Sequence, residues 1–84
     1  MLDPVIVGRV IRRFRERTDH SQEVISELAG IGRSHLSAIE RGERRPTLDT
    51  FVKISQALGV GPGVIMNDIM LEMEEEENEK NKTY

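Results

Sequence analysis

The fold is decided by one stretch of the chain, QEVISELAGIGRSHLSAIERG, at positions 22–42. Its apolar residues recur at helical spacing on both sides of Gly30, and Gly42 ends the second series. Glycine readily adopts the left-handed conformation with which a chain leaves a helix. The stretch therefore predicts two short helices joined by a tight turn, of which the second runs from about Arg33 to Arg41.

The same stretch meets the requirements of two helices that cross after a short turn. Helices that cross at roughly 90 to 120 degrees need a small residue where they meet and apolar side chains on each side of the turn. Ser26 is the small residue, Gly30 lies at the turn, and the apolar positions are Ile25, Ala29, Ile31, Leu36 and Ile39. This combination predicts a helix-turn-helix unit between Gln22 and Gly42.

The outward positions of the second helix are polar or small, and they are Arg33, Ser34, Ser37, Ala38 and Arg41. A helix with such a surface fits the major groove of DNA, which is about 12 Å wide. Arg33 can present its guanidinium fork to O6 and N7 of guanine, a contact worth about 1 to 3 kcal/mol of discrimination against the wrong base. We therefore predict that this helix reads DNA.

Three further helices flank this unit. Before it, a helix is expected from about Pro4 to Thr18 on the apolar series Val7, Val10, Ile11 and Phe14. Ser21 is expected to cap the next helix, which ends at Gly30. After the unit, Thr47 can cap a helix that ends at Gly59, with a buried side expected to contain Leu48, Phe51, Val52, Ser55 and Leu58.

The fifth expected helix begins near Pro62 and carries an apolar stripe, Ile65, Met66, Ile69, Met70 and Met73. The stripe covers the core, but it is longer than a small monomer needs, so it is equally a candidate for half of a dimer interface. From Glu74 the acidic sequence buries too little to offset its ordering entropy. We expect a domain over residues 1–73 and a disordered acidic tail over residues 74–84.

Composition limits what else the chain can be. A chain of 84 residues has room for one domain. It has no cysteine, and His20 and His35 are its only imidazoles, so no disulfide, metal site or cofactor is expected. Neither an export signal nor a membrane-spanning run is visible. We expect an all-α, cytoplasmic protein without an evident small-molecule ligand.

The net charge of −3 is unevenly distributed. Through Pro46, nine arginines and no lysine face seven acids, which leaves +2. From Thr47 onward three lysines face eight acids, which leaves −5. Such an asymmetry is typical of a binding surface joined to a solvating segment, so the negative total does not argue against a polyanionic partner.

The chain closely resembles the Cro and phage-repressor class of helix-turn-helix proteins, also called the Xre family. The resemblance covers about Val7 to Ile65, and its motifs are Val7-Gly8, Ile11, Phe14-Arg15, Ser21-Gln22-Glu23, Ile39-Glu40-Arg41-Gly42, Arg45-Pro46-Thr47-Leu48 and Ala57-Leu58-Gly59-Val60. It implies an all-α, five-helix, lambda-repressor-like fold and a repressor-like transcriptional regulator that binds double-stranded DNA as a homodimer. The chain departs from the family at Ser26, where alanine is usual, and at Gly32, where serine or threonine is usual.

The resemblance also implies roles for individual residues. Base edges would be contacted by Arg33, Ser34, Ser37 and Ala38. Phosphates are expected at Gln22, Arg41, Arg44 and Arg45. An ion pair between Arg15 and Glu40 would tie the first helix to the third. Independently of the family, the N–H groups at the start of the helix capped by Ser21 attract an anion.

Two other classes of function stay open. The first is a protein-interaction module, such as an antitoxin component that covers a partner protein with its C-terminal helix, for which the stripe after Ile65 would be the contact surface. The second is an enzyme. It is the weaker of the two, because the sequence has no nucleophile motif and no arrangement of serine, histidine and acid, and a small helical core offers little concave volume.

Overall fold

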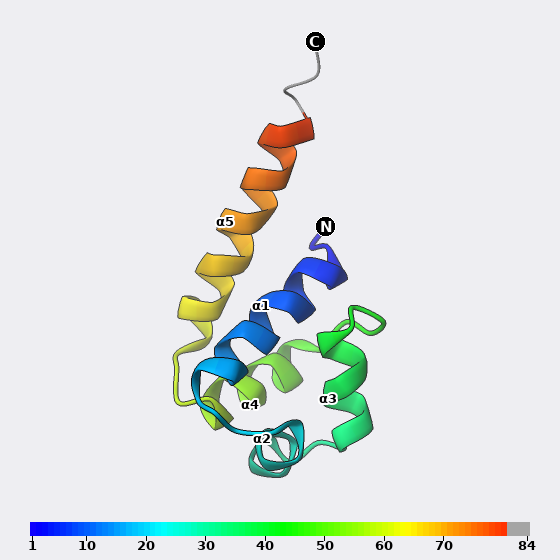
Figure 1. Cartoon of the computed structure of the whole chain (residues 1–84), viewed down its shortest axis with the longest axis vertical. Coiled ribbons are helices and arrows are strands. Elements are labelled where there is room, and N and C mark those ends of the chain that lie inside the picture. The colour runs from blue at the N-terminus through cyan, green and yellow to red at the C-terminus, as the bar shows by residue number, and fades with distance from the viewer. Residues whose placement is uncertain (81–84) are drawn as a thin grey trace.

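Five helices make up the part of the chain that the structure describes, residues 1–80 (Figure 1). This computed structural model contains α1 (Pro4–Arg17), α2 (Gln22–Ala29), α3 (Arg33–Glu40), α4 (Leu48–Ala57) and α5 (Pro62–Lys80). The expectation of an all-α, five-helix fold is confirmed. Helices α2 and α3, with the turn between them, form the helix-turn-helix unit at the residues where the sequence predicts it.

Capping side chains fix where the helices begin. The hydroxyl of Ser21 accepts a hydrogen bond from the Val24 amide at 3.2 Å, and that of Thr47 accepts one from the Thr50 amide at 3.1 Å. Gly32 precedes α3 and provides no side-chain cap. Because glycine is itself an acceptable N-cap, α3 still begins at Arg33 as the sequence predicts.

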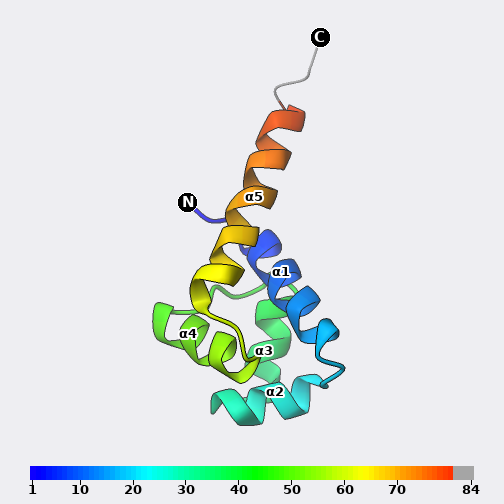
Figure 2. The same cartoon turned by 90° about the vertical axis from the view of Figure 1, so that its left-hand side faces the viewer.

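The core is built from all five helices. Its fully buried members are mostly branched aliphatic residues, namely Val10, Ile11, Ile25, Leu36, Ile39, Ile54, Ile65 and Ile69. Helix α2 packs against α4, and α1 lies between α3 and α5. Figure 2 shows the two ends of this arrangement, with α2 at one end and α5 extending past the rest of the molecule at the other. Helix α1 is therefore packed on two sides, by α3 and by α5.

The backbones of α1 and α3 touch at Gly8. A Cβ atom built on Gly8 would lie 2.1 Å from the carbonyl oxygen of Ile39 and 2.8 Å from that of Glu40. No side chain can fit in that space without moving one of the helices. Gly42, which follows α3, has φ of +77° and would place a Cβ 2.8 Å from the Cα of Val5. Two glycines thus let the end of α3 pack directly on the first turns of α1.

The register of α4 differs from the expected one. Leu48, expected to be buried, is 76% exposed, whereas Ile54, which was not expected in the core, is fully buried. Phe51, Ser55 and Leu58 are buried as expected, and Val52 is half-buried. Leu48 is the first residue of α4 and lines an open groove that no helix of residues 1–80 covers, so its side chain stays exposed.

The end of α5 also differs from expectation. We expected disorder from Glu74, but α5 continues to Lys80. Acidic side chains on this part of α5 pair with two arginines of α1: Arg9 lies 3.0 Å from Glu72 and 3.4 Å from Glu76, and Arg13 lies 2.7 Å from Glu72. These ion pairs extend the contact between α1 and α5 beyond the apolar core. Residues 81–84 of the expected tail lie outside the described residues.

The apolar stripe of α5 divides between core and surface. Ile65 and Ile69 are completely buried within the monomer, so of the two roles considered for the stripe these two residues take the one in the core. Met66 and Met73 are partly buried against the core. Met70 is 47% exposed and remains a candidate contact for a second chain. The division follows from α1 and α4, which both pack on α5 and leave Met70 at its open side.

The contact at Gly8 predicts a large effect of a single methyl group. Gly8→Ala should lower the free energy of unfolding by about 1 to 3 kcal/mol, because the new Cβ overlaps the Ile39 carbonyl. Gly63→Ala is the matched control, since a Cβ at Gly63 meets nothing within 4 Å and alanine favours a helix. Urea denaturation followed by circular dichroism measures both, and equal stability of the two variants would contradict the close packing.

The ion pairs of Glu72 predict a pH dependence of stability. Burial alone would raise the pKa of Glu72, but the ion pair with Arg13 and the hydrogen bonds from Arg9 outweigh it and lower the pKa below its ordinary value. The stabilisation is therefore fully present above the pKa of the unfolded chain, about 4.3, and is lost as the pH falls through the lower pKa of the folded state.

Thermal unfolding checks this dependence. At about pH 6, Glu72→Gln should melt at a lower temperature than the parent chain, and at about pH 3 the difference should shrink towards zero. Glu75→Gln is the control, since Glu75 is exposed on the same helix and forms none of the ion pairs found in residues 1–80. A difference for Glu72→Gln that is the same at both pH values would contradict the assignment.

Candidate nucleic-acid interface

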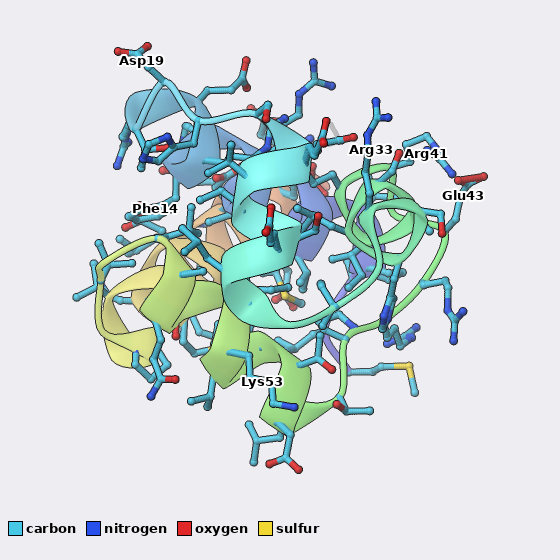
Figure 3. The ribbon with its side chains drawn as sticks, turned by 90° about the horizontal axis from the view of Figure 1, so that it is seen from below. Phe14, Asp19, Arg33, Arg41, Glu43 and Lys53 are labelled. Carbon is cyan, nitrogen blue, oxygen red and sulfur yellow. The ribbon has the colours of Figure 1, made fainter. Side chains whose placement is uncertain are left out.

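The outer face of α3 is open to solvent. Leu36 and Ile39 point into the core, whereas Arg33 and Ser34 are exposed and Ser37 and Ala38 are half-buried. Figure 3 shows Arg33 extending from the molecule on the same side as Arg41. The structure thus brings the four expected base contacts, Arg33, Ser34, Ser37 and Ala38, onto one accessible helix surface. Arg33 and Ser34 are the most open of the four residues.

The opposite side of α3 is held by a buried carboxylate. The Glu40 side chain is 2% exposed. Arg15 Nε donates to Glu40 Oε2 at 2.7 Å and Arg15 Nη2 donates to Oε1 at 2.9 Å, so the ion pair expected from the resemblance is present as a two-bond fork. These hydrogen bonds raise the pKa of Arg15, which therefore stays charged. A bidentate arginine fixes the direction of a carboxylate as well as its position.

The ion pair of Arg15 and Glu40 is also hydrogen-bonded to the start of α2, and we call these residues, with Gln22, the Glu40 cluster. Gln22 Nε2 donates to Glu40 Oε1 at 2.9 Å, and Arg15 Nη1 donates to the carbonyl oxygen of His20 at 3.0 Å. Gln22 was expected at a phosphate, and its main partner in the structure is instead Glu40. Its amide keeps a second N–H for an anion at the start of α2. The cluster joins α1, the start of α2 and the end of α3 in one network.

The arginines around the end of α3 differ in what they contact. Arg45 Nη1 donates to the Leu2 carbonyl at 2.7 Å. Arg41 donates to the Glu43 carboxylate and to the Ser37 hydroxyl. Arg33 and Arg44 are exposed and form no salt bridge within residues 1–80. Of these four arginines, Arg33 and Arg44 therefore have no ion-pair partner in residues 1–80, and Arg41 and Arg45 have intramolecular hydrogen-bond partners.

The arginines of α1 mostly contact the protein itself. Arg9 and Arg13 pair with acids of α5, as described above, and Arg12 lies 3.5 Å from Glu16. The Arg17 guanidinium lies over the Phe14 ring, 4.8 Å from its centroid. Sequence reasoning missed the pairing of α1 with α5. The feature that could have predicted this pairing is the spacing of Asp68, Glu72 and Glu76, which places three acids on one face of a helix.

A cavity of about 280 Å³ lies on another part of the surface, between the start of α1, the loop before α4, and α5. Its only polar lining residues are Arg45 and Thr47, and the rest are apolar. Residues 1–80 hold no cluster of three or more histidine, cysteine or acidic residues suited to a metal ion. None of the described helices is both long enough and apolar enough for a membrane span.

Comparison with known proteins yields a consistent result. A model of the helix-turn-helix family matches residues 11–65. The uncharacterized HTH-type transcriptional regulator y4dJ of Sinorhizobium fredii is 38% identical over 55 residues, which are 66% of this chain and 71% of that protein. Control protein C.BamHI of Bacillus amyloliquefaciens is 39% identical over 59 residues, covering 69% of this chain and 73% of that protein.

A solved structure agrees with the sequence comparisons. The restriction-modification controller protein C.AhdI from Aeromonas hydrophila is similar with a TM-score of 0.74 and 32% sequence identity, over 77% of this chain and 98% of that one. The residues that match the family model contain α2, α3 and α4. They also contain Arg15, Gln22 and Glu40, whose side chains are hydrogen-bonded to one another. Sequence motif, fold and relatives lead to the same result, and the chain belongs to the helix-turn-helix family.

Proposed function

We propose that the chain regulates transcription by binding a specific DNA sequence as a homodimer, with α3 in the major groove. The observation that carries the proposal is the contrast between the two sides of α3. The inner side is anchored by the core and by the buried Glu40, and the outer side presents Arg33 and Ser34 to solvent. A rigidly held helix with a polar outer face is what sequence reading in the major groove requires.

Individual residues have separate tasks in this proposal. Arg33, Ser34, Ser37 and Ala38 contact base edges, while Gln22, Arg44 and Arg45 hold phosphates on either side. The exposure of Arg44 and the unused N–H of Gln22 support the phosphate roles. Arg45 fits this role if it exchanges the Leu2 carbonyl for a phosphate, since an ionised partner gives the stronger hydrogen bond.

The uncovered apolar surface beside α5 supports the homodimer. Leu48 and Met66 line the groove between α1, α4 and α5, and Met70 continues the same face of α5 one turn beyond Met66. In a dimer formed through this surface, a two-fold axis relates the two α3 helices. Such dimers bind half-sites about 34 Å apart, one helical turn of DNA.

Because the proposed partner is DNA, the proposal also covers the mode of action and the cellular location. A regulator of this family acts on DNA without a catalytic centre, a metal or a cofactor, and its action is read out as altered transcription. In bacteria such as the sources of the relatives, DNA lies in the cytoplasm, and we propose the same location for this protein.

The base-reading role of Arg33 is tested with sites selected from random DNA by the parent chain. Arg33→Ala should lower the ratio of specific to random-DNA affinity roughly 5- to 150-fold, which corresponds to about 1 to 3 kcal/mol. Fluorescence anisotropy at one fixed salt concentration measures both affinities. Arg12→Ala is the control, since Arg12 is exposed on α1 and pairs with Glu16. An unchanged ratio for Arg33→Ala would remove Arg33 from base reading.

The dimer surface is tested by a charge placed on it. Met70→Glu should convert the dimer to a monomer in size-exclusion chromatography with light scattering, because an ionised carboxylate cannot be buried without a partner. Leu71→Glu is a matched control, since Leu71 is 48% exposed and lies beside Arg13 and Asp68, away from the groove. A parent chain that is monomeric at all concentrations would favour the interaction module that binds a different protein.

A further inference from the structure

Arg41 lies across the outer face of α3. It is the C-cap residue of α3, and its Nη1 donates a hydrogen bond to the hydroxyl of Ser37, one turn earlier in the helix. Its Nε donates to Oε2 of Glu43 in the following loop. Figure 3 shows Arg41 and Glu43 side by side at the edge of the molecule. The guanidinium is therefore folded back along the helix and held at two points.

This placement differs from that of a side chain that only reaches for a phosphate. Arg33, Ser37 and Arg41 are spaced four residues apart and so lie on one face of α3. The hydrogen bond to Ser37 draws the guanidinium of Arg41 towards that face, where the proposed base contacts lie. The sequence predicts Arg41 as a phosphate contact, whereas its hydrogen bonds direct it to the base-reading surface.

The remaining donors of Arg41 suit a base. A guanidinium has five N–H groups in a fixed plane, and the two hydrogen bonds in the structure use one on Nε and one on Nη1. Nη2 and the second N–H of Nη1 are left, and these two atoms form the end of the fork. A fork of this kind matches O6 and N7 of guanine in the major groove.

We propose that Arg41 reads a base, guanine by its donor pattern, and that Glu43 is a positioning residue that holds the Arg41 guanidinium on the base-reading surface. The inference rests on the proposed function, since it assumes that α3 enters the major groove. It changes the role of Arg41 from a contact that supplies affinity to one that supplies sequence preference.

The charge of Glu43 supports a positioning role. Glu43 precedes Arg44 and Arg45 in a loop at the edge of the proposed DNA surface, where a carboxylate repels phosphates and lowers affinity for every sequence. The pair is also exposed, at 57% for Arg41 and 58% for Glu43, so it adds little to the stability of the fold. Orientation of Arg41 is the remaining contribution of this carboxylate.

The experiment measures binding position by position. Sites selected by the parent chain are changed one base pair at a time, and the dissociation constant of each is compared for the parent, Arg41→Lys, Glu43→Ala and Glu43→Gln. Arg41→Lys keeps the charge but loses the planar fork, so preference at one base position in each half-site should fall roughly 5- to 150-fold. Preference at the other positions should not change.

The Glu43 variants separate positioning from charge. Glu43→Ala should weaken preference at the same base position, because the Arg41 Nε loses its acceptor. Glu43→Gln should retain that preference, since its amide oxygen still accepts the hydrogen bond, while binding to all sequences strengthens as the repelling charge is removed. Thermal melts of all variants should match the parent, because both residues are exposed.

Three outcomes would overturn the inference and are distinguishable. If Arg41→Lys leaves every base preference unchanged, and Arg41→Ala weakens all sequences equally with a salt slope reduced by about 0.9, Arg41 holds a phosphate. If Glu43→Ala strengthens binding to all sequences equally with no loss of preference, Glu43 is only a repelling charge. In both cases the proposed function stands. If the parent chain selects no sequence at all, the proposed function itself fails.

Discussion

The structure depends on the buried carboxylate of Glu40. It accepts hydrogen bonds from Arg15 of α1 and from Gln22 of α2, and it belongs to the last turn of α3. A buried charge is costly unless it is paired and fully hydrogen-bonded, so the three helices are stable together only in the arrangement that brings these groups into contact. The direction of α3, and with it the outward direction of Arg33 and Ser34, is therefore set by an interaction on the other side of the helix.

The arginines of this chain, whose net charge is −3, fall into a group paired with acids and a group without such pairs. Arg9 and Arg13 of α1 are paired with acids of α5, at the end of the molecule where α5 extends past the other helices. Arg33 and Arg44 form no such pairs in residues 1–80. The acids of α5 thus neutralise arginines on the side of α1 that faces α5, whereas Arg33 and Arg44 keep their charge on the surface where a polyanion is proposed to bind.

Local patterns in the sequence were sufficient to predict most of the fold. The caps at Ser21 and Thr47, the left-handed Gly30 and the helix-turn-helix stretch all lie where the sequence predicts them, because each depends on residues close in the chain. The errors concern contacts between distant segments. Arg9 and Glu72 are 63 residues apart, so the ion pairs of α5 are invisible in any local window. The exposure of Leu48 and the partner of Gln22 likewise depend on how helices meet, which periodicity alone does not determine.

The backbone contact at Gly8 has a consequence for how such a protein can change its target. Because α3 rests directly on α1 there, and because Leu36, Ile39 and Glu40 hold its inner side, none of the anchoring groups lies on the outer surface. Residues at 33, 34, 37 and 38 can then be exchanged during evolution without repacking the interior. New recognition specificities are accessible through a few surface substitutions, while the scaffold that aims the helix stays the same.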